Sequence, residues 1–81
     1  MTFSNNQFSL TDGVIATKDD NGVPNGYEGI NAIMRHERGE MDRLVSVGKT
    51  TIRYKTAEEA ARTARSEGQA KIRELTASIA N

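Results

Sequence analysis

The sequence predicts an α+β fold in which a small antiparallel β-meander of three to four strands packs against one long C-terminal helix. A helix-capping pattern followed by apolar residues at spacings of three and four occupies 56–79. Before it, β-branched residues stand between clusters of Gly, Asn and Asp, which is typical of short strands joined by turns. At 81 residues the chain is a single small domain. We expect a loose N-terminus over 1–7, a mainly β part over 8–55 and the helix over 56–79.

The helix begins with a T-x-x-E capping box formed by Thr56 and Glu59. In this motif the hydroxyl accepts from the amide of the third helical residue, while the carboxylate reaches back to the amide of the cap residue. The stripe predicted to face the sheet comprises Ala57, Ala60, Ala61, Ala64, Gly68, Ile72, Leu75 and Ile79. Because Gly costs about 1 kcal/mol relative to Ala inside a helix, we expect a close contact or a local bend at Gly68.

The first strand is predicted from the alternation at Phe8 and Leu10 and from the β-rich run that follows over 13–17. A glycine-rich loop is expected over 19–26. The next segment, 27–38, fits a short helix ended by Gly39, and it also fits a strand. We favour the strand, because β-rich runs follow it directly.

Gly48 and Lys49 form a Gly-first pair, which predicts a two-residue hairpin turn between strands over 40–47 and 50–55. Ile52 and Tyr54 alternate with charged residues on the last of these strands, so we expect them to face the helix. The opposite face of the sheet would then carry Arg43, Arg53 and Lys55.

Composition and charge restrict the function. The chain contains no cysteine, which excludes disulfides and thiolate metal sites. Its formal net charge is zero, which argues against the strongly basic surface of a free-standing nucleic-acid binder. Residues 1–48 hold seven acids and four bases, whereas 49–81 hold four acids and seven bases, so we interpret the halves, about −3 and +3, as complementary sheet and helix. No apolar run could span a bilayer, and we expect a cytoplasmic protein without membrane contact.

Gly48-Lys49-Thr50 resembles the end of a phosphate-binding P-loop. The full motif needs another glycine at the position of Arg43 and a helix directly after the threonine, where this chain has a β-like run. Without a helix N-terminus facing the phosphate, the physical basis of that site is missing. A hairpin turn is therefore the better interpretation.

His36 is the only histidine, and without cysteine it cannot complete a usual zinc set. No serine or threonine stands in a recognisable arrangement with it, so we expect an ordinary surface histidine. Asp19 and Asp20 precede Asn21-Gly22, but the calcium-loop spacing and its distal glutamate are absent. The sequence thus predicts no catalytic residues, no metal and no cofactor, and we interpret the protein as non-enzymatic.

Two motifs stand out in the chain, Tyr27-Glu28-Gly29-Ile30 and Thr56-Ala57-Glu58-Glu59-Ala60-Ala61. With them, residues 27–66 resemble the ethylene-response-factor-type DNA-binding domains and the related arm-binding domains of phage integrases. The resemblance implies a three-stranded sheet packed on a helix and a sheet face that reads the DNA major groove. The residues carried over for DNA binding are Arg43, Arg53 and Lys55. The chain departs from the family in having no Trp and several acidic residues in the sheet region, so we expect weak phosphate binding.

The chain is short, free of cysteine, mixed in charge and predicted to consist of a small sheet with a helix. In this format it also resembles small phage-encoded inhibitors of bacterial defence, the anti-CRISPR proteins. The resemblance implies occlusion of a larger host protein or nucleoprotein complex by an exposed patch with aromatic or Arg anchors. The residues we expect to contact the partner are Tyr27, Arg35, Arg38 and Arg43, with Asp19 and Asp20 engaging a basic nucleic-acid channel.

Our leading hypothesis is therefore a protein-binding module, a phage inhibitor acting by steric and electrostatic occlusion in the host cytoplasm. One alternative is a small DNA-binding or recombination accessory domain. Another is a virion or assembly component that self-associates through Ile72, Leu75 and Ile79 at the end of the helix. We expect a monomer or a weak homodimer.

Overall fold

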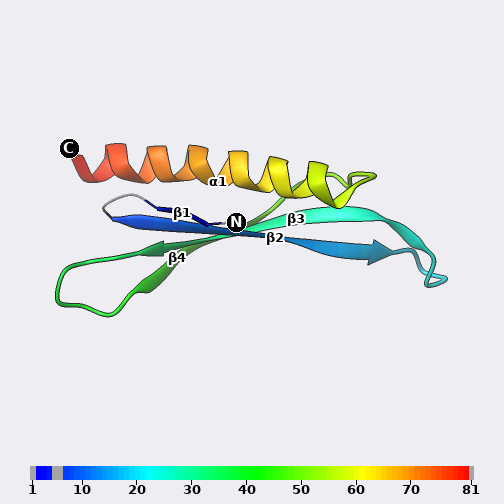
Figure 1. Cartoon of the computed structure of the whole chain (residues 1–81), viewed down its shortest axis with the longest axis horizontal. Helices are drawn as coiled ribbons and strands as arrows, with labels where there is room; N and C mark the ends of the chain where they lie inside the picture. The colour runs from blue at the N-terminus through cyan, green and yellow to red at the C-terminus, as the bar shows by residue number, and fades with distance from the viewer. Residues whose placement is uncertain (1, 5–6, 81) are drawn as a thin grey trace.

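The computed structural model describes residues 2–4 and 7–80. Its elements are β1 (Thr2–Ser4), β2 (Phe8–Lys18), β3 (Pro24–Arg35), β4 (Arg43–Lys49) and α1 (Ala57–Ala80). The strands form one antiparallel sheet in the order β1-β2-β3-β4, and α1 lies along one face of it (Figure 1). The predicted α+β architecture, a meander packed on one long C-terminal helix, is confirmed.

Two expectations about strand positions are settled by the sheet pairing. The ambiguous segment 27–38 is mostly strand, because β3 pairs with β2 on one side and β4 on the other. The expected loose N-terminus is wrong for the residues that the structure describes there, since β1 pairs with β2 in the register Phe3 to Leu10. Residues 1, 5 and 6 lie outside the described part of the chain.

The predicted hairpin at Gly48-Lys49 is wrong. Both residues lie inside β4, and 50–55 contains only an isolated bridge at Tyr54. The side chain of Thr50 turns inward, where its hydroxyl accepts from the Gly29 amide at 3.0 Å and donates to the Ile52 carbonyl at 3.1 Å. These local bonds replace the ladder of a fifth strand and lead the chain from the sheet edge toward the helix.

The core lies between α1 and the two long strands. Phe8 and Leu10 of β2, Ile33 of β3 and Ile72 of α1 form one buried cluster, with Leu75 packed against it. Ile52, which we expected on the helix-facing side, is 59% exposed. The longer strands β2 and β3 supply the inner layer instead, because their alternation turns these side chains toward the helix.

Small residues let the helix lie close to the sheet. Ala60, Ala64 and Gly68 are all buried on α1, whereas Ala57 is exposed, so the contact stripe is narrower than predicted at its start. A Cβ on Gly68 would lie 2.5 Å from Leu10 Cδ1. The close contact expected at Gly68 is therefore present, and it explains a glycine in the middle of a helix.

The helix start follows the capping pattern in part. The Glu59 amide donates to Thr56 Oγ1 at 3.1 Å, as a capping threonine requires. The Glu59 carboxylate accepts from the Thr56 hydroxyl at 3.3 Å. With 24 residues the helix is about 36 Å long at 1.5 Å per residue, and the molecule is correspondingly elongated at 48 × 21 × 18 Å.

Candidate functional site

The sheet face turned away from α1 carries a group of exposed and half-exposed apolar side chains among polar ones. Alternation along β2, β3 and β4 puts six apolar side chains on this side, and we call them the open face: Ile15, Ile30, Ala32, Met34, Leu44 and Val47. Leu44 is 57% exposed and Val47 is 68% exposed. A sheet face that meets only water is normally polar, so this composition indicates a surface used for contact.

A shallow hollow of about 180 Å³ lies within the open face. Its walls come from all three long strands: Thr11, Asp12, Gly13, Ile30, Asn31, Ala32 and Val47. The Ile30 side chain packs close over Gly13, since a Cβ there would lie 3.3 Å from Ile30 Cγ1. A larger residue at position 13 would therefore crowd this part of the hollow.

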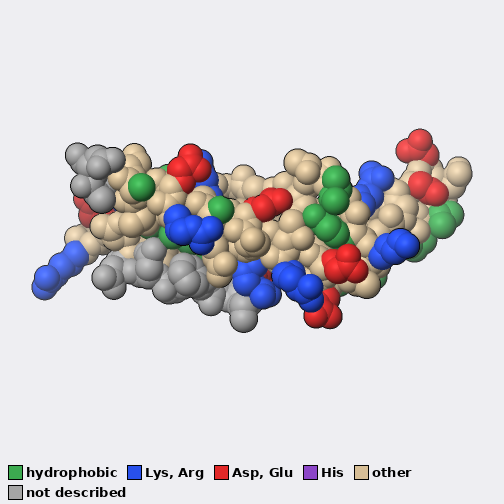
Figure 2. Space-filling view, turned by 90° about the horizontal axis from the view of Figure 1, so that it is seen from above, with side chains coloured by type: hydrophobic (Ala, Val, Ile, Leu, Met, Phe, Trp, Pro, Cys, Tyr) green, Lys and Arg blue, Asp and Glu red, His purple; other side chains and the backbone are tan. Residues whose placement is uncertain are grey.

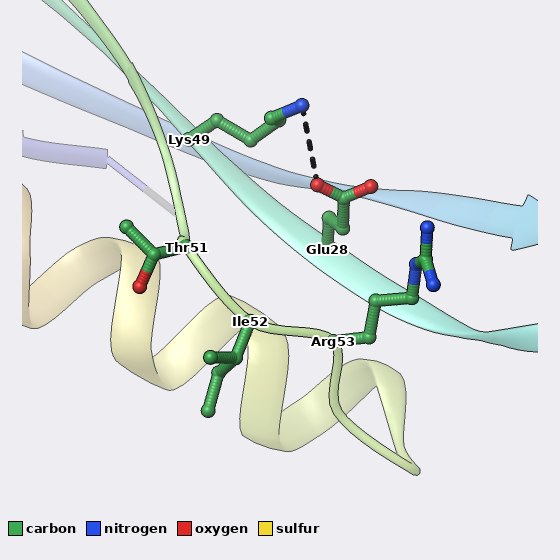
Figure 3. Close-up of a pocket in the computed structure, with 5 residues that line it drawn as sticks. All are labelled: Glu28, Lys49, Thr51, Ile52 and Arg53. Atoms are coloured by element: carbon green, nitrogen blue, oxygen red, sulfur yellow. Dashed lines mark ion pairs between the residues drawn. The ribbon is translucent and has the colours of Figure 1, made fainter.

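A charged groove of about 520 Å³ borders the open face near the end of β4. It is lined by Glu28, Lys49, Thr51, Ile52 and Arg53 (Figure 3). Lys49 Nζ lies 3.3 Å from Glu28 Oε2. In Figure 3 both side chains and Arg53 extend to one side of the chain, while Thr51 and Ile52 point to the other.

This groove does not have the architecture of a phosphate loop. Lys49 is on a strand and pairs with a carboxylate, and Thr50 is fully buried in bonds to the backbone. The helix begins only at Ala57, seven residues after Thr50. Gly48 and Lys49 therefore belong to the end of β4, and Thr50 anchors the backbone that follows it, in place of the hairpin turn expected from the sequence.

At the other end of the sheet, His36 bridges two side chains. Its Nε2 lies 2.7 Å from Ser9 Oγ, and its Nδ1 lies 2.8 Å from Asp42 Oδ1. The expectation that no serine is tied to His36 is wrong. Ser9 is 27 residues away in sequence and becomes a neighbour only because β2 and β3 pair in the register Phe8 to Arg35.

An ionic cluster occupies the same end. Glu37 Oε1 lies 2.8 Å from Arg35 Nη2 and 3.9 Å from Arg43 Nη2. A hydrogen bond from Glu40, followed by the charge of Arg35, lowers the pKa of Glu37 below its usual value. The same hydrogen bond raises the pKa of Glu40. As pH rises, Glu37 therefore loses its proton before Glu40, which favours the charged form of Glu37 beside the arginines.

The residues predicted to contact a partner fall at opposite ends of the molecule. Asp19 lies in the turn after β2, while Arg35, Arg38 and Arg43 lie at or near the 36–42 loop, about 35 Å away along strands that rise about 3.3 Å per residue (Figure 1). The Asp19 carboxylate also accepts the Asn21 and Val23 amides at 2.9 and 3.0 Å. It therefore stabilises the turn.

Tyr27 and Asp20 complete that predicted set and also lie apart. Tyr27 is half-buried on β3, where its backbone exchanges hydrogen bonds of 2.9 and 2.8 Å with Tyr54, and Asp20 is exposed in the turn. The set therefore does not form a single patch.

The residues suggested for DNA binding do not gather either. Arg43 begins β4, whereas Arg53 and Lys55 lie beyond its far end, before α1. On the helix-covered side, basic and acidic side chains are interspersed (Figure 2).

The self-association hypothesis named three apolar residues at the end of the helix. The Ile72 side chain is buried against the sheet, and Leu75 packs on the same cluster. The Ile79 side chain lies outside the described part of the chain.

Among the described residues, no three His, Cys, Asp or Glu side chains stand together as metal ligands. Within the same part of the chain, no helix has the length and apolar character needed to cross a membrane.

Comparison of the chain with family models, with curated proteins and with solved structures finds no match.

Proposed function

We propose that this chain is a protein-binding module that covers a surface of a larger protein or nucleoprotein complex with its open face. The observation that carries this function is the aliphatic composition of that face, with Leu44 and Val47 more than half exposed. Removal of such side chains from water contributes about 25 cal/mol per Å². A partner with an aliphatic surface of its own would supply that burial.

The size of the open face suits a reversible complex. The strands β2, β3 and β4 hold 11, 12 and 7 residues. At about 3.3 Å per residue and 4.8 Å between strands they span roughly 480 Å² in projection. A complex of this kind buries roughly 1,000 Å² in total, whereas permanent homodimers bury about 2,000 Å² or more. The face therefore fits one side of a docked complex with a larger protein better than the core of a permanent dimer.

Polar groups at both ends of the open face would set the orientation of the bound partner. The Glu28–Lys49 pair borders one end, and His36 with Asp42 borders the other. Rim charges of this kind affect association rate and register more than affinity. Occlusion of the partner's site then needs no chemistry, and it is the mode of action of the phage inhibitors that the chain resembles in format.

The docking face is tested by photo-crosslinking in extracts of the source cell. A photoreactive amino acid is placed at position 47 in one variant and at position 52 in another, and only the first should capture the partner. Both positions are exposed and apolar, but only Val47 belongs to the open face. With the crosslinked partner purified, Val47→Asp should weaken binding at least about 100-fold, because it buries a charge. Ile52→Asp should change the affinity less than about threefold.

Three results would reject this function. One is an equal loss of partner affinity in Val47→Asp and Ile52→Asp. Another is concentration-dependent self-association that Val47→Asp abolishes, which would make the occupant a second copy. The third is binding to random duplex DNA with a steep loss on adding salt and relief by Arg53→Ala, which would favour the DNA-binding alternative.

A further inference from the structure

In the neutral form of His36, the directions of its two hydrogen bonds follow from the chemistry of its partners. A carboxylate only accepts, so the 2.8 Å contact with Asp42 puts the proton of the neutral imidazole on Nδ1. Nε2 is then an acceptor. The proton in its 2.7 Å contact with Ser9 therefore comes from the serine hydroxyl.

We propose that Ser9 is a nucleophile, with His36 as its general base and Asp42 as the residue that positions His36. This role goes beyond the proposed docking function, because binding a partner does not require an imidazole that accepts the proton of the Ser9 hydroxyl. The same order of serine, imidazole and carboxylate activates serine on unrelated folds. It is recognised by geometry and roles, not by sequence position.

The three groups are held by separate, paired parts of the sheet. Ser9 is on β2, where it lies opposite Met34 of β3. The His36 amide directly after β3 donates to the Gln7 carbonyl at 2.6 Å. Asp42 directly precedes β4, whose first residue pairs with the last residue of β3. The arrangement therefore depends on strand register as much as on the side chains.

The surroundings of Ser9 select an aliphatic acyl group. Ser9 and Thr11 lie on the same side of β2, about 6.6 Å apart at 3.3 Å per residue. Thr11 begins the wall of the hollow that continues over Gly13, Ile30, Ala32 and Val47. An acyl chain attached to Ser9 would lie along this hollow, so the substrate class is activated esters with a short aliphatic acyl chain.

The reaction balances with water as the only co-reactant. Ser9 Oγ bonds to the acyl carbon while its proton moves to His36 Nε2, and the bond to the leaving alkoxide breaks as that oxygen takes the proton. Water then attacks the acyl carbon and gives its proton to His36 Nε2. The bond to Ser9 Oγ breaks, the hydroxyl regains a proton, and a carboxylic acid leaves.

An alkyl fluorophosphonate tests the nucleophile directly, because serine attack expels fluoride and leaves a stable adduct. Intact mass should show one adduct, and peptide sequencing should place it on Ser9. Ser9→Ala should abolish it, whereas Ser66→Ala, an exposed serine on α1, should leave it unchanged. His36→Gln should slow labelling about 100-fold or more, the usual contribution of a general base.

Asp42→Asn distinguishes positioning from simple loop support. It retains the shape of the side chain but allows the amide to donate to Nδ1, which favours the imidazole tautomer that cannot accept from Ser9. Labelling should fall at least about tenfold, and the dependence of its rate on pH should change, while circular dichroism stays that of the parent chain.

The acyl preference is measured with p-nitrophenyl acetate and p-nitrophenyl butyrate. The butyrate ester should react several-fold faster, since each buried methylene is worth up to about fourfold. Gly13→Val should reduce the ratio of the two rates toward one by filling the hollow. Absence of a Ser9 adduct, or labelling that is indifferent to His36→Gln, would overturn the assignment and leave the docking function untouched.

Discussion

The Asn31 side-chain amide donates a hydrogen bond of 3.0 Å to the backbone carbonyl of Ala64, in the first half of α1. Asn31 is buried on β3, and a Cβ on Gly48 of β4 would lie 2.9 Å from its Oδ1. A glycine on the neighbouring strand thus makes room for a polar side chain that joins sheet to helix. In a small core, such a bond sets the position of the helix along the strands.

Asn31→Ala should destabilise the fold by about 1–3 kcal/mol, since it removes a buried hydrogen bond and leaves a space. Urea unfolding followed by circular dichroism measures the loss. Asn25→Ala, in an exposed position near the start of the same strand, is the control and should change the free energy of unfolding by less than about 1 kcal/mol. An unchanged free energy of unfolding in Asn31→Ala would show that the hydrogen bond to Ala64 does not hold the helix on the sheet.

Gly68→Ala sets helix propensity against packing. Alanine should stabilise a helix interior by about 1 kcal/mol, but its Cβ would lie 2.5 Å from Leu10 Cδ1, and Leu10 is fully buried. We expect a net loss of about 1–2 kcal/mol from overpacking. In the Leu10→Ala background the same substitution should stabilise, and a double-mutant cycle by chemical unfolding measures the coupling. If Gly68→Ala changed the free energy of unfolding equally in the parent chain and in Leu10→Ala, the close contact between Gly68 and Leu10 would not be the cause.

Thr50→Val tests the structural role of the threonine after Lys49. Valine has nearly the same shape but cannot accept from the Gly29 amide or donate to the Ile52 carbonyl. The unfolding free energy should fall by about 1–3 kcal/mol, because a buried amide loses its partner. Thr51→Val, one residue later and exposed, is the matched control and should be nearly neutral.

The ion pair between Asp12 and Arg65 gives stability a dependence on pH. Arg65 Nε lies 2.8 Å from Asp12 Oδ2, and the aspartate side chain is only 5% exposed. Burial acts to raise the pKa of Asp12, but charged hydrogen-bond donors including Arg65 outweigh it, so the pKa lies below the ordinary 3.8. The stabilisation is therefore full above that value and is lost as pH falls through the lower native value.

Asp12→Asn should accordingly cost about 1–3 kcal/mol near neutral pH. The difference from the parent chain should shrink as pH falls below about 3.8. Urea titrations at pH 7 and pH 3 measure both quantities, with the exposed Asp20→Asn as control. A difference that stays constant between these pH values would show that charge is not the cause.

Local sequence patterns were sufficient for several features. The T-x-x-E pattern located the start of the helix, because a cap acts within one turn. Small residues on one stripe predicted the close approach at Gly68, since only their size limits how near a sheet can come. The excess of acids before residue 49 and of bases after it predicted complementarity, which the Asp12–Arg65 pair realises.

Only the tertiary structure decided which residues meet. Thr50 turned inward after β4, where β-branched residues alone predicted one more strand over 50–55, because its hydroxyl bonds outweigh propensity. The register of β2 against β3 brought Ser9 to His36 and turned an aliphatic layer away from the helix. No spacing along the chain records these contacts, because a shift of one residue in strand pairing would exchange the two faces of the sheet.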